Sequence, residues 1–187
     1  MSSSRLVLPA FLTPLLARLR RSAAGRPTPP PVGDADSLRE QLRQHENQGK
    51  RDGVLLMLDI NGFHMVNRIH GQRDGDRVLQ AVTVALRQTL RQRDSLCRYA
   101  GDRFGALLPA TDLDTARALA EQLTRAVADL RITSFEHKEA IPVSVRFAVR
   151  ALDDEPRQLL KETNRALERR MAPAPAERAH ASVVTLV

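Results

Sequence analysis

The chain has 187 residues, of which 42% are hydrophobic and 27% are charged. This balance excludes a wholly disordered protein, and the length allows one domain with a sizeable core plus a short appendage. Aromatic residues make up only 3% and tryptophan is absent, which argues against a single-stranded nucleic-acid binder that stacks bases on aromatic side chains. No apolar run approaches the ~20 residues of a membrane-spanning helix.

The formal net charge of +7 is unevenly distributed along the chain. Residues 1–33 contain five arginines and no acidic residue, so the remainder is close to neutral. We therefore expect no nucleic-acid partner. The single cysteine, Cys97, excludes an internal disulfide and a cysteine-based zinc site, and it is typical of a protein in a reducing cytoplasm.

Residues 1–35 are predicted to form a basic amphipathic segment followed by a proline-rich linker. The apolar run LVLPAFLTPLLA is followed by RLRR and then by GRPTPPPVG. Three interpretations of residues 5–21 stay open: a short helix that docks on a membrane surface or a partner protein, a cleaved targeting signal, and a tail that packs on the domain.

The folded domain is expected over residues 36–187. Ser37–Glu40 form a capping box that starts a helix, and Gly49 ends it. The apolar run GVLLMLDI at residues 53–60 predicts a strand buried on both faces. A short helix around residues 63–69 and a long helix from Asp76 are then expected.

The second half of the chain mixes strands and helices without a repeat, which predicts an α+β layered domain. The expected elements are a hairpin over residues 95–111 that turns at Ala100–Gly101, a helix over 112–130, a second hairpin formed by 131–137 and 141–150, a helix over 155–171 and a strand over 182–187.

Two acidic residues lie at places where a metal site could form. Asp59 closes the buried strand, and Asp102 lies in the turn of the first hairpin. In a polymerase-like palm, carboxylates placed in this way hold Mg²⁺ against a nucleoside triphosphate. Because aspartate is common in turns for conformational reasons, a purely structural role explains the same spacing.

Two long segments, LLMLDINGFHMVNRIHGQRDGDRVLQAV and RQRDSLCRYAGDRFGALLPATDLDTARALAEQL, resemble the GGDEF domain of diguanylate cyclases, bacterial proteins that make cyclic di-GMP from two GTP molecules. The resemblance runs from about Asp36 to Val187. It implies a nucleotidyl-cyclase or palm-like α+β fold with a central, mostly antiparallel sheet flanked by helices. The first block matches at Asp59, Phe63, Asn67, Gly71, Gly75, Asp76 and Leu79.

The family's signature hairpin departs from the pattern in this chain, where it reads Ala100-Gly101-Asp102-Arg103-Phe104. Arg103 replaces an acid, and a fixed cation there opposes metal binding. Ala100 replaces a glycine that lets the backbone approach a phosphate.

Three further departures from the family pattern also indicate a loss of cyclase activity. Arg68 replaces an aspartate that accepts hydrogen bonds from guanine, and arginine has no acceptor, whereas the other guanine contact, Asn67, is retained. Arg146 replaces a glycine. In the family's late block, Glu168 and Met171 replace a tyrosine and a phosphate-binding lysine.

These departures imply an inactive relative of the cyclases. It would have no catalytic residue, no bound metal and no cofactor. The vestigial active site would consist of Asp59, Asn67, Arg68, Ala100, Gly101, Asp102, Arg103 and Phe104.

A second family motif is retained. An RxxD motif five residues before the signature forms the family's inhibitory site, which binds cyclic di-GMP, and Arg91 and Asp94 have this spacing. Arginine can pair with guanine or phosphate, and aspartate accepts from guanine N–H groups. Arg87 and Arg98 are candidates for further phosphate contacts. The alternative is a surface ion pair at i,i+3 on a helix end.

The sequence thus predicts a non-catalytic cyclic di-GMP receptor or adaptor in bacterial signalling. It would be cytoplasmic, with peripheral association at the inner membrane through residues 5–21 as one option, and it would act on a separate output protein. The alternatives are a protein-interaction module that binds no nucleotide, and a residual diguanylate cyclase that relies on Asp59, Asn67 and Asp102.

Overall fold

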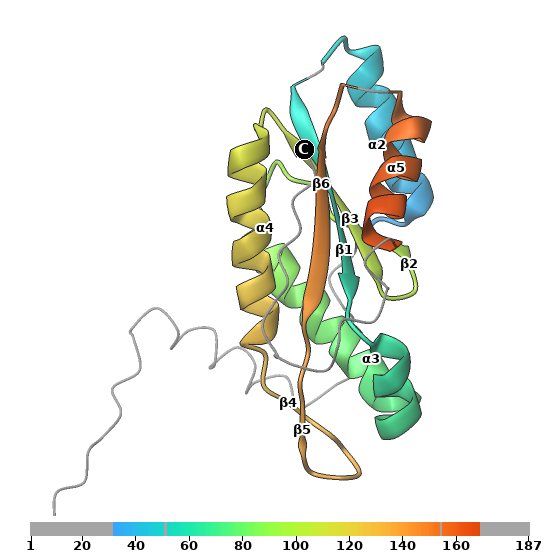
Figure 1. The fold of residues 1–187 in the computed structure, drawn as a ribbon, viewed down its shortest axis with the longest axis vertical. Helices are drawn as coiled ribbons and strands as arrows, with labels where there is room; N and C mark the ends of the chain where they lie inside the picture. The colour runs from blue at the N-terminus through green and yellow to red at the C-terminus, as the bar shows by residue number, and fades with distance from the viewer. Residues whose placement is uncertain (1–31, 51, 154, 169–187) are drawn as a thin grey trace, which may run out of the picture.

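The structure is a computed structural model that describes residues 32–50, 52–153 and 155–168. A four-stranded antiparallel sheet in the order β2-β3-β1-β6 lies between two pairs of helices (Figure 1). The elements are α2 (Ala35–Asn47), β1 (Gly53–Ile60), α3 (Phe63–Thr89), β2 (Cys97–Ala100), β3 (Arg103–Pro109), α4 (Leu113–Ala128), β4 (Ile132–Thr133), β5 (Ala140–Ile141), β6 (Val145–Ala151) and α5 (Pro156–Glu168). The predicted α+β class and antiparallel sheet are confirmed.

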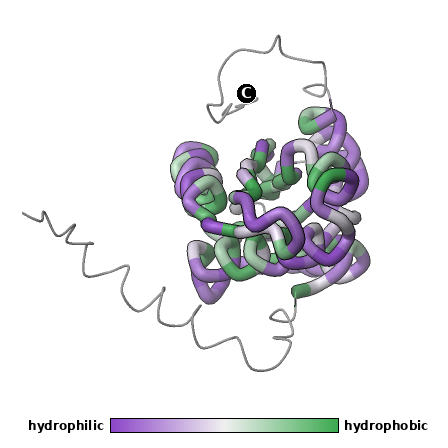
Figure 2. The backbone as a smooth tube through the Cα atoms, turned by 90° about the horizontal axis from the view of Figure 1, so that it is seen from below, coloured by the Kyte–Doolittle hydropathy of each residue, from purple (hydrophilic) through white to green (hydrophobic). Residues whose placement is uncertain are grey.

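Strand β1 is the centre of the domain. All eight of its residues are buried, and it pairs antiparallel with both β3 and β6. Because successive side chains point to opposite faces, Leu56 and Leu58 pack in the core with α3 and α4, whereas Leu55 and Met57 pack with α2 and α5. The amphipathic helices carry both hydrophobic and hydrophilic positions along their length (Figure 2). The predicted strand buried on both faces is confirmed.

The predicted start of helix α2 is wrong by three residues. The N-cap is Asp34, whose Oδ1 accepts from the Ser37 backbone N–H at 2.8 Å, so Ser37 lies inside the first turn. The segment before the helix is already fixed, because Gly33 N–H donates to Leu96 O at 3.1 Å and Gly33 O accepts from Arg98 N–H at 2.7 Å. These bonds along β2 place Asp34, rather than Ser37, at the helix entry.

Helix α3 contains a kink that divides it as predicted. Gly71 has φ 80° and ψ 163°, outside the helical region, and separates a short helical segment from a long one. Glycine adopts this positive φ without the steric cost that other residues incur. The long segment resumes directly after Gly71, earlier than the predicted start at Asp76, because no other residue leaves the helical conformation.

The predicted second hairpin is confirmed only in part. Strands β4 and β5 pair through two residues each, but β6 pairs with β1 instead of continuing this hairpin. Pairing with the central strand buries most of β6, and a long hairpin arm would leave those apolar residues in water. The predicted strand at 182–187 and residues 1–31 of the predicted N-terminal segment lie outside the described residues.

The β4–β5 hairpin is attached to α3 through one buried carboxylate. Asp74 Oδ2 accepts from the Ser134 hydroxyl at 2.9 Å and from the Phe135 N–H at 2.8 Å, and Oδ1 accepts from Arg77 at 2.8 Å. Burial raises the pKa of Asp74, but these hydrogen bonds outweigh burial and hold the pKa below the ordinary value of 3.8. None of the helices in the described ranges is long and apolar enough to cross a membrane.

Substitution Asp74→Ala should lower the free energy of unfolding at pH 7 by about 2–3 kcal/mol, because two donors at the hairpin lose a charged acceptor. The lowered pKa means that this contribution is complete above pH 3.8 and is lost as the pH falls through the folded-state pKa. Urea unfolding at pH 7 and pH 3 measures both effects. The exposed neighbour Asp76→Ala should change stability by less than about 0.5 kcal/mol. Equal losses in both variants would contradict the assignment.

Candidate functional site

The predicted acid Asp59 lies in a row of three charged residues across the sheet. In the strand register, Asp59 of β1 is opposite Arg103 of β3 and also opposite Arg146 of β6. Side chains directly opposite one another on neighbouring strands share a face of the sheet and come into contact. The topology therefore brings two guanidinium groups to one carboxylate, on the face covered by α2 and α5.

Both oxygens of this carboxylate are occupied. Arg146 Nη2 donates to Asp59 Oδ1 at 2.6 Å, and Arg103 Nε donates to Asp59 Oδ2 at 3.2 Å. The Asp59 side chain is 5% exposed, and the two arginines are 18% and 19% exposed. The carboxylate is thus shielded from water and is neutralised by protein groups.

Arg103 links this cluster to the last helix. Its Nη1 donates to Asn164 Oδ1 at 2.9 Å and contacts Glu168 Oε1 at 3.3 Å, both on α5. In the sequence, Arg103, Arg146 and Glu168 are separate departures from the family pattern, and their joining in one network around Asp59 is not predicted from it. The sequence does contain a signal for this network, which is the pattern of charges. Two basic replacements, Arg103 and Arg146, and one acidic replacement, Glu168, occur together with the retained acid Asp59.

Burial raises the pKa of Asp59, and so does the nearby negative charge of Asp102. The guanidinium groups of Arg146 and Arg103 lower this pKa. Burial is the largest effect, so the pKa of Asp59 lies above its ordinary value of 3.8. The opposite charges favour the ionised form, and desolvation opposes it.

The residues around Asp59 do not fit the Mg²⁺ that the family resemblance implies. Magnesium needs oxygen ligands in near-octahedral geometry, but both Asp59 oxygens bind arginines and arginine offers no acceptor. No group of three His, Cys, Asp or Glu side chains within the described ranges could hold a metal ion. A metal would have to bind beside two positively charged guanidinium groups or displace them.

The remaining residues of the signature hairpin are divided between turn and core. Gly101 has φ 50° and forms the tight turn together with Asp102. Ala100 is exposed on β2. Phe104 is fully buried in the core between the sheet and α3, so it has a structural role and does not belong to a surface site.

The two residues predicted to face a guanine base lie on the short first segment of α3. Arg68 is exposed and Asn67 is partly buried. A Cβ atom built on Gly75 would lie 1.8 Å from Asn67 Oδ1, so the Asn67 side chain packs directly on the Gly75 backbone. Asn67 therefore has a packing contact that explains its presence independently of any nucleotide.

The RxxD motif lies in the turn after α3, because the helix ends at Thr89. Asp94 Oδ2 accepts from the Arg91 backbone N–H at 2.8 Å, and Arg87 Nη1 donates to the Asp94 carbonyl at 2.9 Å. Asp94 is 3% exposed, and its second oxygen, Oδ1, is buried without a hydrogen-bond partner among the described residues. Arg91 is exposed.

This geometry differs from the expected helix-end arrangement. The contact joins the Asp94 carboxylate to the backbone of Arg91, and the described structure has no ion pair between the two side chains. Of the two candidate phosphate contacts, Arg98 donates to Gly101 O at 2.7 Å and so braces the signature hairpin. Arg87, as noted, holds the Asp94 carbonyl.

Substitution Asp59→Asn should lower the free energy of unfolding by about 1–3 kcal/mol, because Arg103 and Arg146 keep their charges in a half-buried site without a counter-charge. Chemical denaturation measures the loss. The matched control is Asp114→Asn, whose ion pair with Arg117 uses a carboxylate that is 90% exposed; it should cost less than about 0.5 kcal/mol. A stabilised Asp59→Asn protein would contradict the pairing.

Most of the chain matches a known protein family. Residues 35–172 match the family described as "Diguanylate cyclase, GGDEF domain". The chain is 41% identical over 95 residues to the diguanylate cyclase DgcP of Pseudomonas aeruginosa, an alignment that covers 49% of this chain and 14% of that protein. It is 34% identical over 119 residues to DgcM of Escherichia coli K12, with 64% and 28% coverage. The chain thus spans less than a third of either relative.

Solved structures share the same architecture. Diguanylate cyclase SiaD of P. aeruginosa superimposes with a TM-score of 0.72 at 24% identity, covering 94% of this chain and 67% of that chain. The coiled-coil and GGDEF domain of DgcB from Caulobacter crescentus gives a TM-score of 0.68 at 20% identity, covering 93% and 92%. At these identities the likeness concerns the fold.

Proposed function

Because the chain belongs to the GGDEF family of diguanylate cyclase domains, we propose that it is a non-catalytic member that binds cyclic di-GMP through Arg91 and Asp94. In this proposal the domain acts as a receptor or adaptor in bacterial second-messenger signalling and passes the signal to a separate protein.

The loss of cyclase activity is supported by the state of Asp59. Each of its two oxygens accepts a hydrogen bond from an arginine, Arg146 or Arg103, so a metal ion would have to share an oxygen with a guanidinium or displace it. The positive charge of Arg103 stands where the family has an acid, which raises the cost of bringing a divalent cation there. Arg68 offers donors where guanine needs an acceptor.

Ligand binding is supported by the exposed side chain of Arg91. Asp94 Oδ1 has no donor among the described residues but is buried, so a guanine N–H group would reach it only after the turn that holds Asp94 opens. Arg91 precedes Asp94 by three residues in the sequence. Its exposed guanidinium can donate two coplanar hydrogen bonds to the same ligand. The DgcB structure of similar fold is described as a complex with c-di-GMP.

An output partner is supported by a neighbour of similar fold. SiaD is described in complex with its activator SiaC, which shows that a domain of this architecture can occur in a complex with a second protein. We propose that this domain does the same in the cytoplasm, with residues 5–21 as the docking segment for a partner or for the inner membrane surface.

Calorimetry with cyclic di-GMP tests the receptor proposal. The full chain should bind with a micromolar dissociation constant, and Arg91→Ala should weaken binding by about 10- to 100-fold, the value of a charged hydrogen bond. The exposed arginine of α5, Arg157→Ala, is the matched control and should bind like the wild type. Absence of heat with the wild-type chain would overturn the proposal in favour of a module that binds no nucleotide.

Incubation with GTP and Mg²⁺ or Mn²⁺, followed by chromatography of the products, tests the loss of activity. We expect no cyclic di-GMP above a protein-free control, since both metal-facing oxygens are occupied. Cyclic di-GMP formed by the wild type and abolished in Asp59→Asn would identify a residual cyclase instead.

A further inference from the structure

The turn formed by residues 91–94 is closed by three hydrogen bonds between described residues. Asp94 Oδ2 accepts from the Arg91 backbone N–H at 2.8 Å, and the Asp94 N–H donates back to Arg91 O at 3.1 Å. Arg87 Nη1, from the last turn of α3, donates to the Asp94 carbonyl at 2.9 Å. Aspartate side chains commonly bond neighbouring backbone groups in this way, and the contacts together hold the turn in one conformation.

Both ends of this turn are anchored in the core. Leu90 before it and Leu96 after it are 7% and 6% exposed, and both belong to the hydrophobic cluster between the sheet and α3. The Ser95 N–H donates to Leu107 O of β3 at 3.1 Å, and Ser95 Oγ accepts from the Leu107 N–H at 3.1 Å. Opening of the turn is therefore opposed by hydrogen bonds and by the burial of two leucines.

The two side chains of the motif differ in what they offer to a ligand. Asp94 is 3% exposed, with one oxygen bonded to the Arg91 N–H and the other buried. Arg91 is exposed, and the turn fixes its backbone. Guanine accepts hydrogen bonds from an arginine at O6 and N7, whereas its N1–H and its 2-amino group need an acceptor such as a carboxylate. With the turn closed, this motif can meet only the O6 and N7 edge.

We propose that Asp94 is a positioning residue, which holds the turn that presents Arg91, and that guanine is recognised through O6 and N7 alone. This inference rests on the proposed function and goes beyond it, because it gives the two residues different roles. It follows that the site does not distinguish guanine from hypoxanthine, the base that lacks the 2-amino group but keeps O6, N7 and N1–H.

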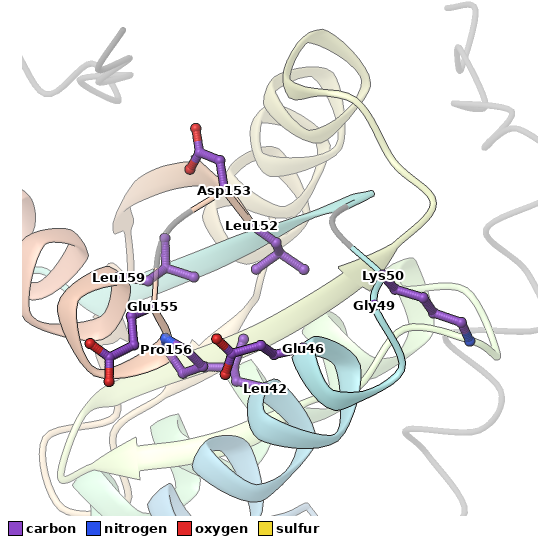
Figure 3. Close-up of a pocket in the computed structure, with 9 residues that line it drawn as sticks. All are labelled: Leu42, Glu46, Gly49, Lys50, Leu152, Asp153, Glu155, Pro156 and Leu159. Atoms are coloured by element: carbon purple, nitrogen blue, oxygen red, sulfur yellow. The ribbon is translucent and has the colours of Figure 1, made fainter.

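The pocket between α2 and α5 does not offer the ligand a second site (Figure 3). Its volume is about 170 Å³, below the roughly 300–1,000 Å³ that is typical of ligand pockets. Glu46, Asp153 and Glu155 line it with three carboxylates, which would repel the two phosphates of cyclic di-GMP. The substitution Glu46→Gln therefore serves as a control that should leave ligand binding unchanged.

Calorimetry of the full chain with cyclic di-GMP and with its hypoxanthine analogue, cyclic di-IMP, tests this inference. If guanine is recognised at O6 and N7 only, the two dissociation constants should agree within about threefold. If Asp94 accepts from the 2-amino group, cyclic di-IMP should bind about tenfold or more weakly, because it lacks a hydrogen bond to a charged group. That result would overturn the inference. The comparison uses the wild-type chain, so it does not depend on the folding of a variant.

Substitutions at Asp94 separate the two roles. Asp94→Asn keeps an oxygen that can accept from the Arg91 N–H, so it should bind cyclic di-GMP within about threefold of the wild type. Asp94→Ala removes this acceptor and should weaken binding about tenfold or more, because Arg91 is no longer held in place. Circular dichroism confirms that each variant is folded.

Equal losses in Asp94→Asn and Asp94→Ala would show that the ligand needs the carboxylate itself and would overturn the positioning role. An Asp94→Ala protein that binds like the wild type would overturn it as well. Absence of binding by the wild-type chain is a different outcome, since it would overturn the proposed function and this inference with it.

Discussion

The ionic contact of Asp59 with Arg103 and Arg146 is the interaction on which the proposed function depends. An isolated buried carboxylate is unfavourable by several kcal/mol unless opposite charge and hydrogen bonds compensate it. The resemblance to diguanylate cyclases implies that a metal ion supplies the compensation in active members. Here two arginines from the neighbouring strands supply it, and the proposed function rests on these contacts competing with a metal for the carboxylate.

The substitutions around this carboxylate form a connected set. Arg103 contacts Asp59 and also Glu168, and Arg146 contacts Asp59 from the other side. Each of these three positions carries a charge where the family has a different residue, and each new charge meets an opposite one. The cluster is therefore an ion-pair network that joins β1, β3, β6 and α5.

The sequence predicted the features that local signals determine. The buried strand β1 followed from an unbroken apolar run, the division of α3 from two separate sets of apolar residues at helical spacing, and the first hairpin from the Ala100–Gly101 turn. Non-local pairing was harder, because nothing in the segment 141–150 says that it pairs with β1 instead of with its sequence neighbour. The start of α2 was missed for a related reason, since the bonds of Gly33 to β2 decide between two possible caps.

In the candidate site, too, the sequence predicts which residues lie together but not the contacts that depend on the tertiary structure. Asp59 and Arg103 were predicted to lie together, but the contact of Arg146 with Asp59 requires the β1–β6 register. For Arg91 and Asp94, sequence spacing placed the pair but not its geometry, in which the carboxylate binds a backbone N–H and leaves one oxygen unsatisfied. Side-chain direction in a turn depends on backbone conformation that residue types alone do not specify.

Electron paramagnetic resonance of Mn²⁺ added to the protein tests the state of Asp59 most directly, because bound Mn²⁺ loses the six-line signal of the free ion. If both Asp59 oxygens are held by arginines, the free-ion signal should grow in proportion to added Mn²⁺, identically for the wild type and Asp59→Asn. Stoichiometric loss of signal with the wild type, restored in Asp59→Asn, would show that this carboxylate still holds a metal and would contradict the account.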